Sequence, residues 1–118
     1  MHPLLEFVTR IAPKRCGVHP AFGKVAEMVV YQEALGEPLF SAVEFDTARE
    51  RARLAMPYNP VNPEEYEKCL DVLEMAILRH RRDKHGINAE PERMEVLDAS
   101  IADDPDGVAV VQSDWWVL

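Results

Sequence analysis

The 118 residues of this chain are enough for one compact domain and too few for two independent hydrophobic cores. Hydrophobic residues make up 47% and charged residues 29%, a balance that excludes a wholly disordered protein. The net charge of −8 disfavours sequence-independent binding to phosphate backbones, so direct nucleic-acid binding is not expected. Most of this charge lies in residues 86–118, which hold eight acidic residues and one basic residue, Arg93.

The cysteines and the first ten residues bear on the location of the protein. Cys16 and Cys69 are far apart and belong to no repeated spacing, so we expect reduced thiols rather than a disulfide scaffold. Glu6 and Arg10 interrupt the apolar residues near the N-terminus, which argues against a signal peptide or a membrane span. We therefore expect a cytoplasmic protein with no membrane anchor.

Two apolar patterns at helical spacing occupy the first third of the chain. The first predicts a short helix over residues 4–12 that ends before Pro13, because a proline disfavours helical geometry in the residue that precedes it. The second, after a loop, predicts a helix over residues 20–35. Gly36 is placed to end that helix in a left-handed conformation.

Residues 38–45 carry the signals of two different structures. Their apolar residues fit a short extended segment, whereas Ser41 followed by Glu44 resembles a helix capping box. We favour the extended segment. Asp46 is then expected to cap a short, mostly solvated helix over residues 47–56.

The strongest helix signals surround residues 63–85. The preceding residues 57–63 contain three prolines and two asparagines, which predict a rigid extended connector. Asn62 is a preferred N-cap, Pro63 suits the first helical position, and the acidic first turn and basic last turn complement the helix dipole. Gly86 ends the pattern, so we expect the main structural helix here.

The acidic C-terminal region is predicted to form a β-hairpin. Residues 105–107, Pro-Asp-Gly, lie between two β-prone runs at 93–102 and 108–118, and this tripeptide is typical of a turn. A helix beginning at Pro91 and running to residue 102 is the alternative, because the apolar residues there also fit helical spacing.

Together these elements predict an α+β fold. The chain is expected to be a single domain, residues 1–118, with three to four helices forming a core over residues 1–85. The acidic region 86–118 packs on that core, and its hairpin closes one side.

A metal site is not expected. Cys16 and His19 have the two-residue gap found in half of some zinc sites, but the other candidate ligands are distant. His80 and His85 are five residues apart, so their side chains should leave a regular helix about 140° apart. We interpret Cys16 as a small buried residue and His19 as a helix-start residue, and we expect no cofactor.

No motif in the sequence supports catalysis. The chain contains no nucleophile elbow, no glycine-rich phosphate loop and no paired-histidine zinc motif. Its carboxylates are typical of a solvated surface and imply no acid or base without a difference in burial. A small enzyme or metal-binding protein that uses Cys16, His19 and His80 is the third of three functional hypotheses.

The leading hypothesis is a noncatalytic protein-binding module. Its acidic C-terminal region is expected to dock on a basic partner surface, as a small inhibitor of the immunity type or the phage anti-defence type would. A tryptophan exposed beside acidic residues would anchor such an interface. The candidate partner-binding residues are Asp103, Asp104, Asp106, Asp114, Trp115 and Trp116.

The second hypothesis is a structural or assembly protein that forms a homo-oligomer. It would use an exposed apolar stripe on the predicted 63–85 helix, with Tyr66, Leu73 and Ile77 in the interface. A stable dimer would favour this hypothesis, and a monomer would favour docking on a different protein.

Overall fold

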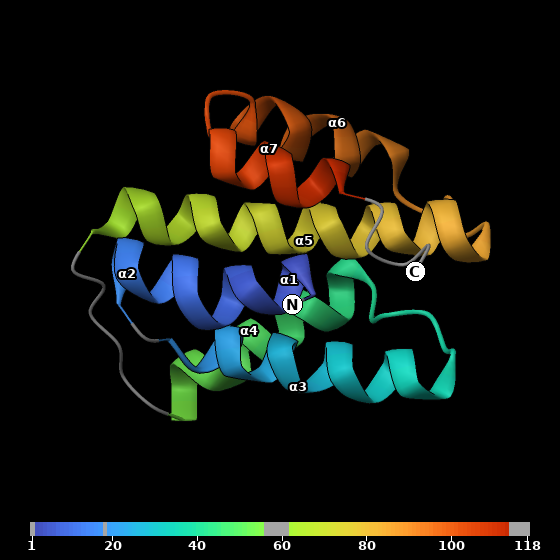
Figure 1. The fold of residues 1–118 in the computed structure, drawn as a ribbon, viewed down its shortest axis with the longest axis horizontal. Helices are drawn as coiled ribbons and strands as arrows, with labels where there is room; N and C mark the ends of the chain where they lie inside the picture. Colours follow the sequence, from blue (N-terminus) through green and yellow to red (C-terminus); the bar gives the residue numbers. More distant parts are fainter. Residues whose placement is uncertain (1, 18, 56–61, 114–118) are drawn as a thin grey trace.

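The computed structural model describes residues 2–17, 19–55 and 62–113, and most of them lie in helices joined by short loops (Figure 1). No strand occurs in these ranges. The predicted α+β fold with a C-terminal β-hairpin is therefore wrong, and the described part of the chain is all-helical.

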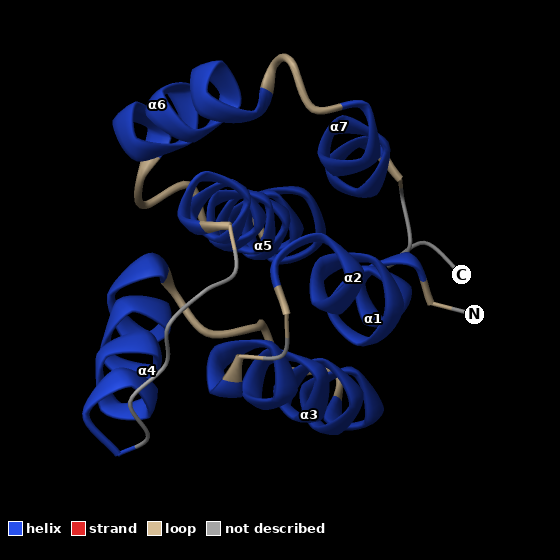
Figure 2. Cartoon of the chain, turned by 90° about the vertical axis from the view of Figure 1, so that its left-hand side faces the viewer, coloured by secondary structure: helices blue, strands red, loops and turns tan. Residues whose placement is uncertain are grey.

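The long helix α5 (Pro63–His85) lies at the centre of the molecule (Figure 2). On one side of it lie α6 (Pro91–Ile101) and α7 (Pro105–Gln112). The N-terminal helices lie on the other side of α5. Helix α3 (Pro20–Leu35) packs against them, and α4 (Ala42–Ala55) packs against both α3 and α5. Because α5 has neighbours on several sides, it takes part in most of the packing of the domain.

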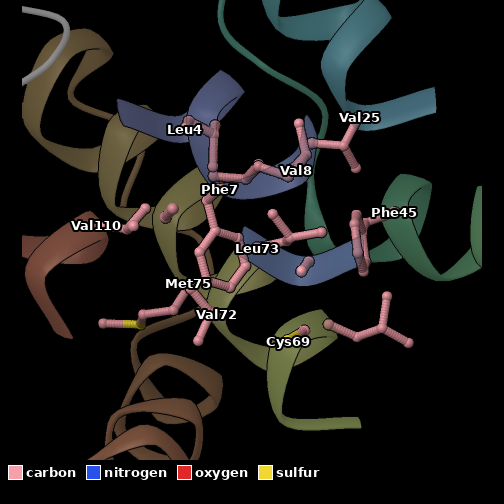
Figure 3. Packing of buried hydrophobic residues seen from close by; sticks show 14 of the residues in the cluster. Leu4, Phe7, Val8, Val25, Phe45, Cys69, Val72, Leu73, Met75 and Val110 are labelled. Atoms are coloured by element: carbon pink, nitrogen blue, oxygen red, sulfur yellow. The ribbon is translucent and has the colours of Figure 1, made fainter. Parts of the chain in front are cut away.

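The core surrounds the middle of α5, where every residue from 72 to 78 is buried. Phe7, Leu73, Met75 and Val110 lie close together there, although they come from helices far apart in the sequence (Figure 3). Tyr66, Leu73 and Ile77, the stripe expected to mediate homo-oligomers, are all buried in this core. Because these three side chains pack inside a single chain, the prediction that they form an exposed stripe for homo-oligomers is wrong.

The N-terminal helix does not stop at Pro13. It runs through α1 (Pro3–Glu6), a π-helical turn η1 (Phe7–Ile11) and α2 (Ala12–Cys16), with Pro13 at the second position of α2. In the π turn the N–H of Ala12 donates to the carbonyl of Phe7, five residues back. This wider turn changes the hydrogen-bond register just before the proline, which has no N–H to donate, and so the helix continues.

Helix α4 begins four residues earlier than Asp46, the predicted cap. Ser41 and Glu44 form the capping box: the N–H of Ser41 donates to Glu44 Oε2 (2.6 Å), and the N–H of Glu44 donates to Ser41 Oγ (3.3 Å). The extended segment predicted for residues 38–45 is therefore wrong from residue 42 onward. Asp46 lies inside the helix, where it accepts a hydrogen bond from Arg49 instead (2.9 Å).

The two helices with the clearest start and stop signals, α3 and α5, are confirmed. The side chain of Asn62 caps α5 by accepting from the N–H of Glu65 (3.3 Å), as predicted. Gly36 and Gly86 end the two helices with φ of 71° and 70°, a conformation that favours glycine. The predicted connector lies outside the described residues, apart from its last two positions.

The C-terminal region contains two helices where a hairpin was predicted. The alternative helix beginning at Pro91 is α6. The Pro-Asp-Gly sequence is the first turn of α7, because the side chain of Asp104 caps this helix and Pro105 follows at its first position. Val110 and Val111 are buried on the inner face of α7. The final residues of the second predicted strand, 114–118, lie outside the described residues.

Candidate docking surface

The structure places the candidate partner-binding residues in different environments. Asp103 and Asp106 are exposed, and Lys68 Nζ donates to Asp103 Oδ1 at 2.8 Å. Asp104, between them, is only 5% exposed. The other three candidates, Asp114, Trp115 and Trp116, lie outside the described residues.

Both carboxylate oxygens of Asp104 are engaged within the chain. Oδ1 accepts the N–H of Gly107 (3.1 Å), and Oδ2 pairs with an Arg15 guanidinium nitrogen (2.8 Å). The Arg15 Nε in turn donates to Glu65 Oε2 (2.7 Å). This ion network joins α2, α5 and the start of α7, so the carboxylate of Asp104 has a structural role inside the domain.

The outer face of α6 brings acidic and small apolar side chains together. The helix buries Met94, Leu97 and Ile101, which recur at steps of three and four residues. The opposite face is therefore exposed, with Val96 at 59%. We call the exposed side of this helix the α6 surface; its residues are Glu92, Glu95, Val96, Asp98 on the flank, Ala99, and Ala102 directly after the helix.

The α6 surface is negative because the one cation of the region is used elsewhere. Arg93 is the only basic residue of segment 86–118. Its guanidinium contacts both carboxylate oxygens of the buried Glu74, with an Nη2 to Oε1 distance of 2.7 Å and an Nε to Oε1 distance of 3.0 Å. Burial raises the pKa of Glu74, and the hydrogen bond from Arg93 opposes that shift. The pair fixes α6 on α5 and leaves Glu92, Glu95 and Asp98 as the exposed charged side chains of α6.

A cleft of about 440 Å³ borders the α6 surface between α5, α6 and α7. Glu95 and Asp98 line it on the α6 side, Arg79 and Met75 on the α5 side, and Val111 on the α7 side. Arg79 also donates to the carbonyl of Val111, which links α5 to α7 at this cleft. The cleft therefore gives the acidic face a concave edge with both apolar and charged walls.

Cys16 and Cys69 are buried and carry reduced thiols. Burial raises the pKa of Cys16 and raises the pKa of Cys69 to about 12. Both groups are therefore protonated at neutral pH, a state that makes a thiol a weak nucleophile and a weak metal ligand.

His19 is a helix-start residue, as its sequence position indicates. Its Nδ1 accepts the N–H of Ala21 (3.1 Å), and its Nε2 lies 3.1 Å from the hydroxyl of Tyr66. The acceptor role of Nδ1 assigns the ring proton to Nε2 in the neutral tautomer. Burial lowers the pKa of His19, and the charges of Arg53 and Arg49 lower it further.

His80 lies far from His19, so the two do not share a pocket. Tyr66, the partner of His19, is fourteen residues before His80 on α5, which corresponds to about 20 Å along the helix. Burial, followed by the neighbouring charge of His85, lowers the pKa of His80 to about 4.

The rings of His80 and His85 meet at a centroid distance of 5.1 Å, so their predicted divergence is wrong. Helical side chains lean toward the N-terminus, which brings the ring of His85 back over the preceding turn. Within the described ranges, no group of three or more His, Cys, Asp or Glu residues is arranged to hold a metal ion.

Among the helices of the described residues, none combines the length and the apolar character needed to cross a membrane. Comparison of the chain with models of protein families, with curated proteins and with solved structures found no match. A function can therefore be inferred only from the residues and the fold of this chain.

The sequence indicates Glu92, Glu95 and Asp98 as part of the acidic C-terminal region, but the candidate partner-binding residues chosen from it include neither these carboxylates nor Val96. In a hairpin, alternate residues of segment 93–102 would face opposite sides, which divides these side chains between two faces. Helical spacing unites them: the buried positions 94, 97 and 101 place Glu92, Glu95 and Val96 on the other side. The alternative prediction, a helix beginning at Pro91, would have identified the α6 surface through the spacing of its apolar residues.

Proposed function

We propose that this protein is a noncatalytic binding module that docks through its α6 surface on a basic surface of a protein partner. A small inhibitor of the immunity type or the phage anti-defence type has this character. The observation that carries the proposal is the exposure of Val96 beside Glu92, and of Glu95 and Asp98 toward the neighbouring cleft, on a helix held in place by buried contacts.

The composition of the α6 surface suits such a role. Acidic residues at the rim steer a basic partner toward the face and disfavour acidic competitors. Val96, Ala99 and Ala102 form a small apolar centre that loses little side-chain entropy on binding, and the alanines let a partner approach the helix closely. Asp106 extends the negative charge toward α7, whereas the charge of Asp103 is paired with Lys68.

We place this activity in the cytoplasm. The proposal rests on the two buried cysteines in the reduced thiol form, which suit a reducing compartment. The partner is a protein rather than a nucleic acid, because a phosphate backbone would be repelled by the acidic face.

Affinity capture from the native cells tests the proposal. The tagged wild-type protein is compared with a variant in which Glu92→Gln, Glu95→Gln and Asp98→Asn neutralise the α6 surface. The matched control carries Glu50→Gln, Glu64→Gln and Glu67→Gln, three exposed carboxylates on α4 and α5. Captured proteins are washed at low and then at high salt and identified by mass spectrometry.

We expect the wild type and the control to retain one basic protein at low salt, and the α6 variant to lose it. High salt should release it from the wild type, because screening weakens charge-guided contacts. Equal retention by the α6 variant and the control would contradict docking through this surface, and so would the absence of any specific partner.

A further inference from the structure

The fold brings together the two cysteines that lie far apart in the sequence. Cys16 is the last residue of α2, and Cys69 lies in the second turn of α5, the helix against which α2 packs. Both side chains are buried in the same hydrophobic cluster. A side-chain hydrogen bond joins the two thiols. Docking through the α6 surface makes no use of either cysteine.

The hydrogen bonds around Cys16 give the direction of the contact between the thiols. The Sγ of Cys16 donates to the carbonyl of Ala12 at 3.2 Å, and the carbonyl of Gly17 is a second acceptor at 3.8 Å. Because the proton of Cys16 is directed at these carbonyls, Cys69 is the donor in the bond between the thiols and the Cys16 sulfur is the acceptor. The two sulfur atoms are therefore in direct contact, and a disulfide requires only that they move closer together.

We propose that Cys16 and Cys69 are a redox-sensitive pair, in which a peroxide converts the two contacting thiols into a disulfide that joins α2 to α5. The reduced pair is the state of the structure. The oxidised pair is a second, covalently linked state of the same fold.

Cys16 is the first of the two to react. It ends α2, and the last residue of a helix frays more easily than the interior of α5, where Cys69 lies. The hydrogen bond from Cys69 and the charge of Arg15 also oppose the rise that burial causes in the pKa of Cys16. Both effects favour the thiolate of Cys16, which is the form that attacks a peroxide.

The reaction runs in two steps with hydrogen peroxide as the oxidant. The thiolate of Cys16 attacks one peroxide oxygen, the O–O bond breaks, and the products are a sulfenic acid and a hydroxide that takes up a proton to become water. The sulfur of Cys69 then attacks the sulfur of Cys16. The S–S bond forms, the S–O bond breaks, and the hydroxyl group leaves as a second water with the proton of Cys69. The two thiols together lose two electrons, and the peroxide gains them.

Burial and contact have opposite effects on the two steps. Burial raises the pKa of both thiols, to about 12 for Cys69, so little thiolate is present at neutral pH and the first step is slow. The second step is fast because Cys69 already touches the sulfur that it attacks. The sulfenic acid is therefore converted to a disulfide before a second peroxide oxidises it to a sulfinic acid.

The disulfide would stabilise the domain without covering the α6 surface. The segment that it closes contains α3 and α4, and a cross-link over so long a segment lowers the conformational entropy of the unfolded chain. Helices α2 and α6 lie on different sides of α5 (Figure 1). The oxidised protein should therefore keep its exposed acidic face, and the redox pair does not depend on the proposed docking function.

Intact-mass spectrometry of the full chain tests the proposal. The reduced wild type is treated with hydrogen peroxide at low protein concentration, then unfolded in urea with iodoacetamide to label any remaining thiol. We expect the loss of two hydrogen masses, no label on either cysteine, and two labels after treatment with a reductant. A peptide map should contain Cys16 joined to Cys69. The thermal unfolding midpoint should rise by about 10 °C on oxidation.

Cys16→Ala and Cys69→Ala are the matched controls. Each retains one thiol, so peroxide can neither remove two hydrogens from it nor raise its thermal midpoint; circular dichroism checks that both are folded. The wild-type result stands by itself if a variant does not fold. A wild type that keeps both thiols, gains oxygen as a sulfinic acid or links only to other copies would overturn the proposal. A disulfide that fails to raise the thermal midpoint would also overturn it, because the native fold would not then accommodate the bond.

Discussion

The carboxylate of Asp104 contacts two other parts of the chain with its two oxygens. One oxygen caps α7 at Gly107, and the other pairs with Arg15, which also holds Glu65. A buried carboxylate in such a position is held by charge-assisted hydrogen bonds, and removal of one partner leaves the others unpaired. Its exposed neighbour Asp106 has the same side chain and a different environment.

Asp104→Ala is therefore expected to lower the free energy of unfolding by about 3 kcal/mol. The loss combines the helix cap with the unpaired charge left on Arg15. Asp106→Ala, two residues away and exposed, should change the free energy of unfolding by less than about 0.5 kcal/mol. Urea denaturation followed by circular dichroism measures both values, and equal effects would refute the structural role of Asp104.

At the scale of the element, Gly107 explains how closely α7 approaches α5. A Cβ at this position would lie 2.5 Å from Cγ2 of Val72, closer than two non-bonded carbon atoms approach in proteins. Val72 is fully buried, and a β-branched side chain in a helix has little freedom to rotate away. The glycine in Pro-Asp-Gly thus serves helix packing rather than a turn.

Gly107→Ala should lower the free energy of unfolding by about 2 kcal/mol, because the overlap outweighs the better helix propensity of alanine. Gly23→Ala is the matched control. This glycine lies in α3 with negative φ, and a Cβ there would meet nothing within 4 Å. It should raise the free energy of unfolding by roughly 0.5–1 kcal/mol. Thermal or urea unfolding measures the free energy of unfolding of both variants. Stabilisation by both substitutions would contradict the close packing of α7 on α5.

Local signals predicted those elements whose ends carry several agreeing residues. The ends of α5 were predicted correctly from Asn62, Pro63 and Gly86, and the end of α3 from Gly36. Such predictions succeed because helix capping depends on residues that are close in the sequence. The Pro-Asp-Gly sequence has two local meanings. It begins a helix when the preceding residue is a capping Asp104 and the following valines pack on a buried helix, and that packing is not visible locally.

The residues of the candidate site, like the helix at Pro-Asp-Gly, depend on packing that local sequence signals do not reveal. The acidic character of the C-terminal region is a property of the composition and could be predicted. The individual residues could not, because burial divides them: Asp104 lies inside the ion network, whereas Glu92, Glu95 and Asp98 lie outside. This division depends on which helix covers which face, and so it requires the fold.

At the scale of the whole molecule, α5 separates two exposed surfaces of different character (Figure 1). The α6 surface is acidic with a small apolar centre, whereas the outer side of α3 exposes Val30, Tyr31 and Leu35, with Glu27 on the same side. The α6 surface is the one whose charge suits the proposed basic partner.

The most direct test of docking through the α6 surface is the salt dependence of the association rate with the captured partner. Stopped-flow mixing compares the wild type with the variant that carries Glu92→Gln, Glu95→Gln and Asp98→Asn. Between about 50 mM and about 500 mM salt, the wild-type rate constant should fall about tenfold or more, while the variant starts lower and changes little. Identical rate constants and identical salt dependence for the two proteins would contradict the account.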